Sequence, residues 1–305
     1  MSAEALRPPL AVALAEAVAT LPRGAGWAYE PKFDGHRMVV FRTAERVVLQ
    51  ARSGRIITAA FPDLADAARE LAPGTVLDGE VVVWTQGRTD FAAVQRRAAA
   101  TPARAPLLAR RLPASYAAFD LLAQAGRDLR AEPYERRRAR LVEVLGPLGP
   151  PLQAVPMTTS VETALTWYET LPASGIEGLV AKRLNGPYRS GHRAWRKVRH
   201  TDTREAVVIG HTGGPNRPAA LVLVLPGDDV PVVSSPLPAA LRAEAGRALA
   251  PLAAEGGGTA VAAGLGEVAY RAVAPGLLAE VEWATTRHAG ATVLRLREAG
   301  GEAGG

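Results

Sequence analysis

Apolar and polar residues alternate or recur in short runs along the first 200 residues, and turn-forming residues separate the runs. β-branched runs of strand length predict strands at 37–42, 46–52, 75–84, 115–122, 175–183 and 195–199. Apolar residues at helical spacing predict helices at about 61–72, near 90–99, over 133–146 and over 161–171, with Ser160 as the N-cap of the last. The apolar stretch at 10–21 also reads as a short packing helix.

The pattern changes near residues 200–204. From there, short apolar strands recur at 205–211, 220–226, 230–235, 267–273, 278–283 and 291–297, with one helix at 238–254 and a glycine-rich break at 256–258. That content suits a small barrel such as an OB-fold. Strands outnumber helices over the whole chain, which favours an α+β fold with antiparallel sheets over a doubly wound fold. We expect a first domain over 1–202, an OB-fold domain over 203–298 and a disordered tail over 299–305.

Composition narrows the class of protein. The 305 residues are 48% hydrophobic and 22% charged, as expected for a soluble globular protein with a core. The net charge of +6 suits a polyanionic partner, although an arginine-rich surface alone would also produce it. The absence of cysteine excludes disulfides, thiolate metal sites and cysteine nucleophiles. The N-terminus lacks the pattern of a signal peptide, and no segment reaches the length of a membrane span.

Lysine is rare in this chain and therefore informative. Of the 36 basic residues only three are lysine, at Lys32, Lys182 and Lys197, and the other 33 are arginine. A lysine can lose its proton and become a nucleophile when burial or a neighbouring charge lowers its pKa, whereas arginine stays protonated. Lysine also serves as a compact charge against a phosphate. Compositional drift toward arginine could leave three lysines by chance. The residues around each lysine must therefore show whether it has a function.

Acidic residues accompany two of the three lysines. Asp34 follows Lys32 by two residues and would point to the same face of an extended segment. Asp78 and Glu80 interrupt an otherwise apolar strand, where burial without partners is costly, so they face solvent or serve a site. In the remaining two strands, Glu177 and Lys182 bracket an apolar run, and one strand face carries Trp195, Lys197 and Arg199.

Six short segments occur in a fixed order: KFDGHR (32–37), ARSG (51–54), LDGEVVV (77–83), AFDLL (118–122), EGLVAKR (177–183) and AWRKVR (194–199). In this order they resemble the collinear motifs of the covalent nucleotidyltransferase superfamily, which includes ATP-dependent DNA ligases, RNA ligases and mRNA capping enzymes. The segments GWAYEPKFDGHR and YRSGHRAWRKVRH look most like small bacterial and end-joining ATP-dependent DNA ligases. The resemblance covers about residues 20–200 and implies an adenylation domain followed by an OB-fold.

The resemblance also implies roles for individual residues. Lys32 would attack the α-phosphate of ATP and hold AMP covalently. The nucleotide would be bound by Glu30, Pro31, Arg37, Arg52, Glu80, Phe119, Lys182, Lys197 and Arg199. Glu80 and Glu177 would bind Mg²⁺ or Mn²⁺. Arg52, Arg55 and Arg193 would contact nicked duplex DNA. The resemblance further implies a cytoplasmic, nucleoid-associated monomer that acts in repair or end joining. Its protein partners would come from those pathways.

Each of several of these residues also has an explanation that involves no function. The segment around Lys32 could be a surface turn, Phe119 could be core, Arg52 could be a solvated strand end, and Lys182 could be a strand-end charge without a phosphate contact. The arginines at 136–138 read as the solvent face of a helix.

The sequence also departs from the family pattern. Arg199 replaces a usual second lysine, and the C-terminal arginine-x-aspartate-lysine motif is reduced to Arg295-Leu296-Arg297-Glu298. An RNA ligase or capping-type enzyme, or a nick-binding protein with impaired catalysis, are therefore the alternatives.

Overall fold

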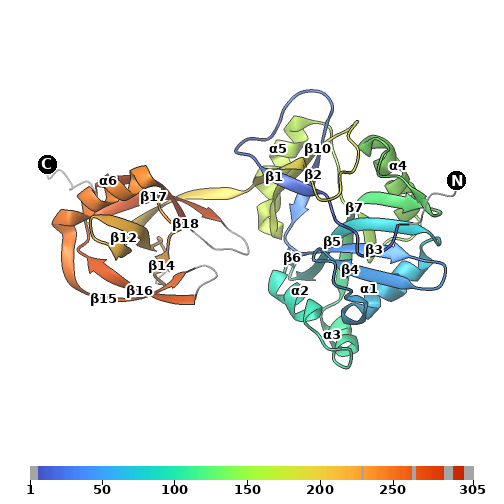
Figure 1. Ribbon diagram of the computed structural model, residues 1–305, viewed down its shortest axis with the longest axis horizontal. Coiled ribbons are helices and arrows are strands. Elements are labelled where there is room, and N and C mark those ends of the chain that lie inside the picture. Colours follow the sequence, from blue (N-terminus) through green and yellow to red (C-terminus); the bar gives the residue numbers. More distant parts are fainter. Residues whose placement is uncertain (1–5, 228–229, 263–265, 285–290, 299–305) are drawn as a thin grey trace. The chain divides into compact units, whose positions relative to one another are not determined.

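The computed structural model describes residues 6–227, 230–262, 266–284 and 291–298, and contacts divide the chain into two compact units, Met1–His200 and Thr201–Gly305 (Figure 1). Each unit has its own sheets and its own apolar clusters. The tail predicted to be disordered, 299–305, lies outside the described residues. Within the described ranges, no helix combines the length and the apolar character that crossing a membrane requires.

The larger sheet of the first unit has the strand order β4–β3–β5–β7–β8, with β6 beside β5 and β9 beside β7. Its strands are β3 (His36–Arg42), β4 (Val47–Ala51), β5 (Thr75–Thr85), β6 (Arg88–Thr89), β7 (Ala114–Gln124), β8 (Arg127–Asp128) and β9 (Leu152–Ala154). All these pairs are antiparallel except β7 with β9. The predicted strands between residues 37 and 122 are confirmed.

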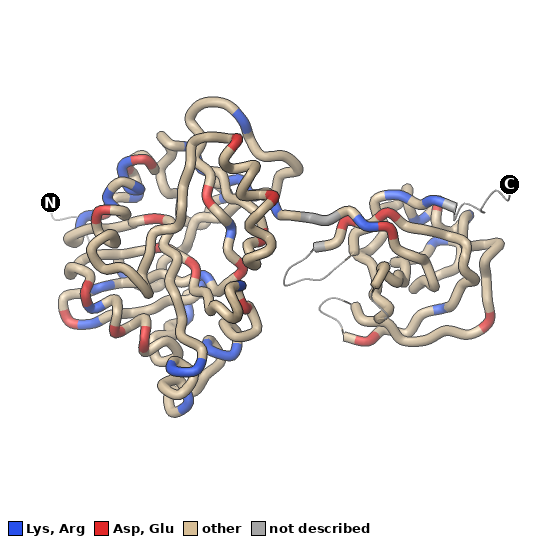
Figure 2. The backbone as a smooth tube through the Cα atoms, turned by 180° about the vertical axis from the view of Figure 1, so that it is seen from behind, with Lys and Arg blue, Asp and Glu red and all other residues tan. Residues whose placement is uncertain are grey.

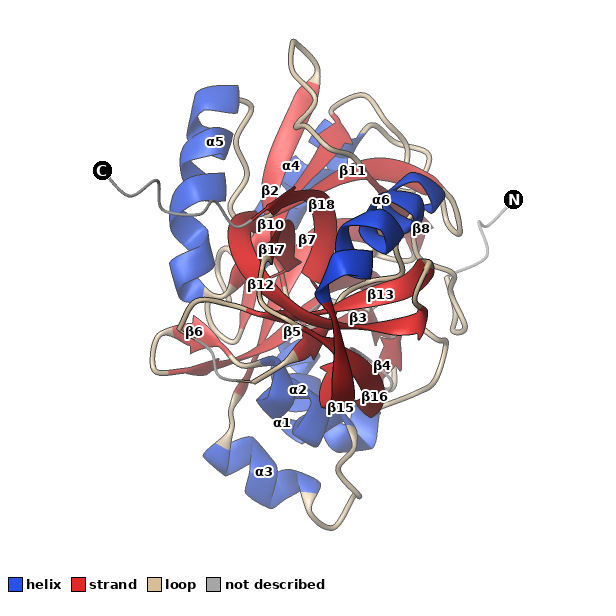
Figure 3. Ribbon diagram, turned by 90° about the vertical axis from the view of Figure 1, so that its left-hand side faces the viewer, coloured by secondary structure: helices blue, strands red, loops and turns tan. Residues whose placement is uncertain are grey.

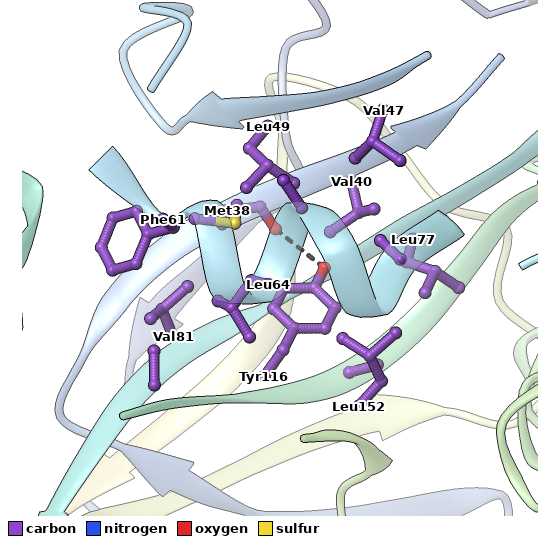
Figure 4. Close-up of a cluster of buried hydrophobic side chains, with 14 of the residues drawn as sticks. Met38, Val40, Val47, Leu49, Phe61, Leu64, Leu77, Val81, Tyr116 and Leu152 are labelled. Atoms are coloured by element: carbon purple, nitrogen blue, oxygen red, sulfur yellow. Dashed lines mark hydrogen bonds between the residues drawn. The ribbon is translucent and has the colours of Figure 1, made fainter. Parts of the chain in front are cut away.

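Three helices pack beside this sheet: α1 (Pro62–Ala67), α2 (Phe91–Ala98) and α3 (Ala105–Arg111), which lie together near one end of β5 (Figures 1 and 3). The core beneath them joins Met38, Leu49, Leu64 and Tyr116, and the Tyr116 hydroxyl donates a hydrogen bond of 2.9 Å to the Met38 carbonyl (Figure 4). The helix predicted at 61–72 is confirmed, with a 3₁₀ turn over Ala68–Glu70, whereas α3 was not predicted.

The smaller sheet carries one polar face. Its order is β1–β11–β10–β2, formed by β1 (Leu14–Ala17), β11 (Arg193–Arg199), β10 (Ile176–Arg183) and β2 (Trp27–Phe33). Helix α5 (Val161–Thr170) covers one face, where its Ala164 packs with Tyr29, Leu179, Ala181 and Val198. As predicted, the Ser160 side chain caps α5 by accepting from the Thr163 amide. Side chains alternate along β2 and β10, so Glu30, Lys32 and Lys182 point to the face opposite α5.

Two predictions for the first unit are wrong. The segment 10–21 forms no helix: Leu10, Val12 and Ala13 pack into a buried cluster, and β1 pairs in parallel with β11. Its backbone donors bind other segments instead, since the Ala13 amide donates to the Tyr188 hydroxyl.

Two of the three arginines predicted to face solvent in α4 (Tyr134–Leu145) also differ from the prediction, whereas Arg136 is exposed as predicted. Arg137 and Arg138 are buried and do not face solvent. Arg137 pairs with the equally buried Asp120 at 2.7 Å, and Arg138 donates to the Val155 carbonyl. Buried charges are tolerated when partners satisfy them in this way.

The second unit is a closed five-stranded barrel with two further strands. The barrel runs from β12 (Thr201–Gly214) through β13 (Arg217–Val224), β14 (Val232–Val233), β15 (Ala253–Ala262) and β16 (Gly266–Val273) back to β12. Strands β17 (Leu277–Ala284) and β18 (Ala291–Glu298) extend the sheet from β12, and α6 (Ala239–Leu249) packs on the core. The α+β class and the OB-fold barrel are confirmed.

The glycine-rich break predicted at 256–258 is instead part of strand β15. Gly257 lies opposite Arg271 of β16. A Cβ atom at Gly257 would lie 2.0 Å from the Tyr270 carbonyl oxygen. Glycine therefore permits close approach of two strands here and does not end the strand.

Candidate active site

Lys32 lies on the polar face of the smaller sheet, in β2. The register places Glu30 opposite Val180, and Val180 opposite Lys197 on β11. Arg199 lies opposite Gly178, next to Glu177. Strand β2 and the distant pair β10 and β11 thereby bring the lysine, two further cations and the acidic residues into neighbouring rows.

The Lys32 ammonium forms an ion pair with Glu177 Oε1. The Glu177 side chain is buried, and its other oxygen lies 3.9 Å from Arg199 Nε. The Lys32 side chain remains 22% exposed, so a ligand can reach the amine. Glu177 therefore orients the amine, while Arg199 supplies a second positive charge beside it.

Burial lowers the pKa of Lys32 to about 8. The negative charge of Glu80 opposes this shift, and the positive charges of Arg199 and Lys197 add to it. Burial also raises the pKa of Glu80 to about 7, against the opposing effects of Lys32 and Arg37. A substantial fraction of Lys32 can thus be neutral near physiological pH, which is the state that a nucleophilic amine requires.

Asp78 fixes Arg37 on the larger sheet. Arg37 donates from Nε to Asp78 Oδ1 at 3.0 Å and from Nη2 to Oδ2 at 2.6 Å. The Tyr188 hydroxyl donates to the same Oδ2 at 2.6 Å. The Arg37 guanidinium also lies 5.1 Å from the Phe119 ring centroid and 5.2 Å from that of Trp195. Asp78 is thus buried with its charge fully satisfied, and Arg37 is held rigidly.

Close packing explains the glycines of the two DG pairs. A Cβ atom on Gly35 would lie 2.2 Å from the Val81 carbonyl oxygen, and one on Gly79 would lie 2.5 Å from the Tyr116 ring. Both positions therefore require glycine for the strands that carry Arg37, Asp78 and Glu80 to approach each other.

Lys182 is buried at the Glu30 end of the site. Its ammonium pairs with Glu30 Oε2 at 2.7 Å and donates to the Phe119 carbonyl at 2.8 Å. The centroids of three aromatic rings surround it, at 4.9 Å for Phe119, 4.8 Å for Tyr134 and 4.4 Å for Trp195. The Tyr134 hydroxyl donates to the other oxygen of Glu30. Lys182 is therefore part of a buried polar network and is not a solvated strand-end charge.

Phe119 belongs both to the site and to the core. It is partly buried against a cluster that includes Trp195 and Val180, and its ring meets Trp195 edge to face at 5.8 Å. Pro31 lies between Glu30 and Lys32 on β2, opposite Leu179.

Two of the three arginines predicted to contact DNA lie close enough to Lys197 for their charges to lower its pKa. Burial lowers the pKa of Lys197, and the positive charges of Arg199, Arg52 and Arg193 lower it further. Arg52 and Arg55 are exposed in the turn after β4, where Gly54 has a φ of 89°. Arg193 begins β11. Arg55 is not among the charges that lower the pKa of Lys197.

The carboxylates expected to bind a metal both act on Lys32, Glu177 through an ion pair and Glu80 through its charge. Over the described ranges, no group of three or more histidine, aspartate or glutamate side chains is arranged to hold a metal ion. Mg²⁺ is commonly bound by one or two carboxylates together with substrate phosphates. The pair Glu80 and Glu177 fits that pattern.

No role for Tyr134, Tyr188 or Asp120 was predicted from the motifs. Tyr134 binds Glu30, which is 104 positions away in the chain, and Tyr188 binds Asp78, which is 110 positions away. No spacing in the sequence indicates such pairs. Tyr188 does fall within the YRSGHRAWRKVRH segment, which was a usable signal.

In the second unit, the arginines of the reduced C-terminal motif are paired on the barrel extension. Arg295 Nε donates to Glu280 Oε2 at 2.5 Å, and Arg297 Nη2 donates to the same oxygen at 3.0 Å. One carboxylate of β17 thus holds both guanidinium groups of β18.

This geometry is accompanied by similarity to known proteins. Residues 8–199 match the family model of the ATP-dependent DNA ligase domain, which is more than half of the chain. The chain belongs to the ATP-dependent DNA ligase family. It is 37% identical over 226 residues to DNA ligase C2 of Mycolicibacterium smegmatis, and the aligned region covers 73% of this chain and 63% of that protein. DNA ligase C of Mycobacterium tuberculosis is 36% identical over 230 residues, covering 73% of this chain and 64% of that protein.

Ligases of known structure have the same fold. A mycobacterial DNA ligase D complexed with ATP and MES is 27% identical and superimposes with a TM-score of 0.54, covering 95% of this chain and 96% of that chain. A Lig E DNA ligase shares the fold with a TM-score of 0.61 at 18% identity, covering 93% of this chain and 99% of that chain. The chain spans less than two thirds of the length of the ligase C relatives.

Proposed function

We propose that the protein is an ATP-dependent DNA ligase that seals nicks between a 3′-hydroxyl and a 5′-phosphate. The observation that carries this proposal is the amine of Lys32, held by Glu177 and with its pKa lowered to about 8. Membership of the ligase family and the arrangement of the other motif residues around this amine support it. An amine of this kind suits covalent catalysis.

In the first step, neutral Lys32 Nζ attacks the α-phosphorus of ATP. A P–N bond forms, the P–O bond to the β-phosphate breaks, and pyrophosphate leaves. The amine loses one proton as the bond forms, and Glu177 Oε1, which contacts Nζ, is placed to accept it. Lys197 and Arg199 supply positive charge where negative charge develops on the phosphate.

In the second step, an oxygen of the 5′-phosphate attacks the same phosphorus. The P–N bond breaks, Lys32 regains a proton, and AMP is joined to the DNA through a pyrophosphate linkage. In the third step, the 3′-hydroxyl attacks the 5′-phosphate, a phosphodiester bond forms and AMP leaves. Arg37, fixed by Asp78, and the exposed Arg52 would orient the nucleotide and the 5′-phosphate, and Arg55 and Arg193 would contact the DNA.

We assign the purine to the other end of the site. Phe119 supplies an aromatic face beside Val180, while Glu30, Pro31 and Lys182 border the base. Glu80 and Glu177 would hold Mg²⁺, or Mn²⁺ in its place, and the ion would neutralise charge on the phosphates.

The names of the relatives support a place in repair or end joining. A multifunctional non-homologous end joining protein LigD of Mycobacterium bovis is 33% identical over 220 residues, covering 66% of this chain and 26% of that protein. The pairing of Arg295 and Arg297 with Glu280 favours one alternative, a nick-binding protein with weak self-adenylylation, because both arginines are already engaged.

Nick sealing tests the proposal. The full chain is incubated with a nicked duplex, a divalent metal and either ATP, GTP or NAD, and we expect sealing with ATP. Nicks that end in 3′-deoxyribose and in 3′-ribose separate DNA ligation from RNA ligation, because an RNA-handling enzyme would require the 2′-hydroxyl. Binding of the nick without sealing and without labelled AMP on the protein would identify the impaired alternative.

A further inference from the structure

A cavity of about 410 Å³ lies under the connection between β10 and β11, at the Lys182 end of the site. Five arginines line it, Arg137, Arg183, Arg189, Arg193 and Arg196, and no carboxylate side chain is among the lining residues. Acidic and basic positions are otherwise interspersed along the first unit (Figure 2). This concentration of one charge in a concave site is therefore a local feature of the fold.

Most of these charges are free to bind a ligand. Arg137 is neutralised by Asp120, and Arg196 pairs with Glu16 at 2.8 Å. Arg183 stacks on the Trp27 ring at 3.9 Å, which leaves its charge uncompensated. Arg189 and Arg193 are exposed and have no ion pair with any described carboxylate. Three guanidinium charges thus converge on the cavity without a counter-charge in its wall.

The connection that presents these arginines is fixed on both sides. The Tyr188 amide donates to the Arg130 carbonyl at 2.8 Å, and the Tyr188 hydroxyl binds Asp78. Gly186 accepts from the Tyr134 amide at 2.9 Å, and Gly191 donates to Val12 at 3.0 Å. The backbone that carries these arginines is therefore held in place before any ligand arrives, which lowers the entropic cost of binding.

Guanidinium groups that converge in a fixed cavity favour phosphate, because each can donate two parallel hydrogen bonds to its oxygens. The volume is within the range of sites for small ligands, so it can hold more than one phosphate group. Arg193, which lines the cavity, also lies close enough to Lys197 for its charge to lower the pKa of that lysine. Positively charged side chains therefore extend without a break from the candidate active site to the cavity.

We propose that this cavity is a second phosphate site, which binds backbone phosphates of a nucleic-acid strand that extends from the nick. The continuity of cations from Lys197 through Arg193 favours a strand over a free polyphosphate. The inference rests on the proposed function, in that the strand is taken to be the ligase substrate. Its new element is the assignment of Arg183 and Arg189 to phosphate binding.

The test compares two double variants of the full chain, Arg183→Gln with Arg189→Gln and, as the control, Arg110→Gln with Arg111→Gln. The control removes the same charge from two exposed arginines of α3. Affinity for a nicked duplex is measured across salt concentrations. Each lost phosphate contact should reduce the slope of log affinity against log salt by about 0.9, so we expect a decrease of about 1.8 for the cavity variant and no change for the control.

A third variant, Arg189→Ala, guards against misfolding, because this exposed side chain has no ion-pair partner among the described residues, and it should lower the slope by about 0.9. Equal slopes for the cavity variants and the wild type would overturn the proposal. Tripolyphosphate is tested in parallel, and loss of tripolyphosphate binding with an unchanged DNA slope would overturn the assignment to a strand. Self-adenylylation should be unchanged in the cavity variants, whereas its absence in the wild type would contradict the proposed function instead.

Discussion

The Tyr188 hydroxyl lies 2.6 Å from Asp78 Oδ2 and donates a hydrogen bond to it across 110 residues of sequence. Asp78 in turn receives both donors of Arg37. A phenol of the β10–β11 connection on the smaller sheet therefore fixes, through one buried carboxylate, an arginine of the larger sheet. The two sheets are tied together at the site by this chain of bonds.

Replacing Tyr188 with phenylalanine should weaken both the fold and the site. A hydrogen bond to a charged group contributes about 1.5–3 kcal/mol, so we expect a loss of that size in the free energy of unfolding, measured with urea. Self-adenylylation should also slow because Arg37 loses its fixed position. The control is Tyr29→Phe, which removes a 2.8 Å hydrogen bond to the neutral Pro22 carbonyl. Equal effects of the two variants on adenylylation would contradict the positioning role.

Lys182→Met tests the buried network at the Glu30 end. Removing one partner of a buried pair leaves an uncompensated charge, which costs about 3–5 kcal/mol. We expect that loss of stability together with a higher KM for ATP, because Glu30 loses its partner at 2.7 Å. Arg97→Met is the matched control, since Arg97 is equally buried and pairs with Asp63 at 2.5 Å, away from the site. Folded Arg97→Met should keep the KM of the wild type; an unchanged KM in Lys182→Met would exclude the assignment.

The rate of self-adenylylation should depend on pH through Lys32. Its pKa of about 8 means that the neutral amine becomes about tenfold scarcer for each pH unit below that value. The rate should therefore rise from pH 6 to pH 8 and level off above it. Single-turnover measurements with labelled ATP follow this directly. A rate that is flat between pH 6 and pH 8 would show that deprotonation of Lys32 does not limit the step.

Glu80→Gln should stabilise the protein at alkaline pH. Burial raises the pKa of Glu80 from 4.5 to about 7, so the folded state binds more protons than the unfolded state between these values. Stability contributed by this group is then present below pH 4.5 and is lost as the pH rises to 7. The variant, which carries no charge, should exceed the wild type in stability at pH 8 by more than at pH 5. Glu45→Gln, on an exposed turn, serves as the control; a pH-independent difference for Glu80→Gln would refute this account.

Strands were predicted correctly where the local pattern of apolar residues is enough to determine the structure. Val39, Val40 and Val81 lie in strands because β-branched runs of strand length suit a buried sheet. The prediction of a helix around Leu10 and Val12 was wrong because the apolar residues of this segment fit a helix as well as an extended chain. Pairing of the segment with strand β11 determines that it is extended.

The same limit applies to the site. Lys32, Glu80 and Glu177 were predicted as site residues because their motifs occur in a fixed order, and the structure brings them close together. The burial of Arg137 was missed, because its partner Asp120 lies on another element and the run of arginines resembles a solvated helix face. Tyr134 was missed for the same reason, since its bond to Glu30 exists only in the folded chain.

The most direct measurement is the mass of the tryptic peptides after incubation of the full chain with ATP and Mg²⁺. We expect one AMP on the peptide that contains Lys32 and none in Lys32→Arg, with the fold of that variant checked by its urea transition. AMP on a peptide containing Lys182 or Lys197, or no AMP on the wild-type protein, would contradict it.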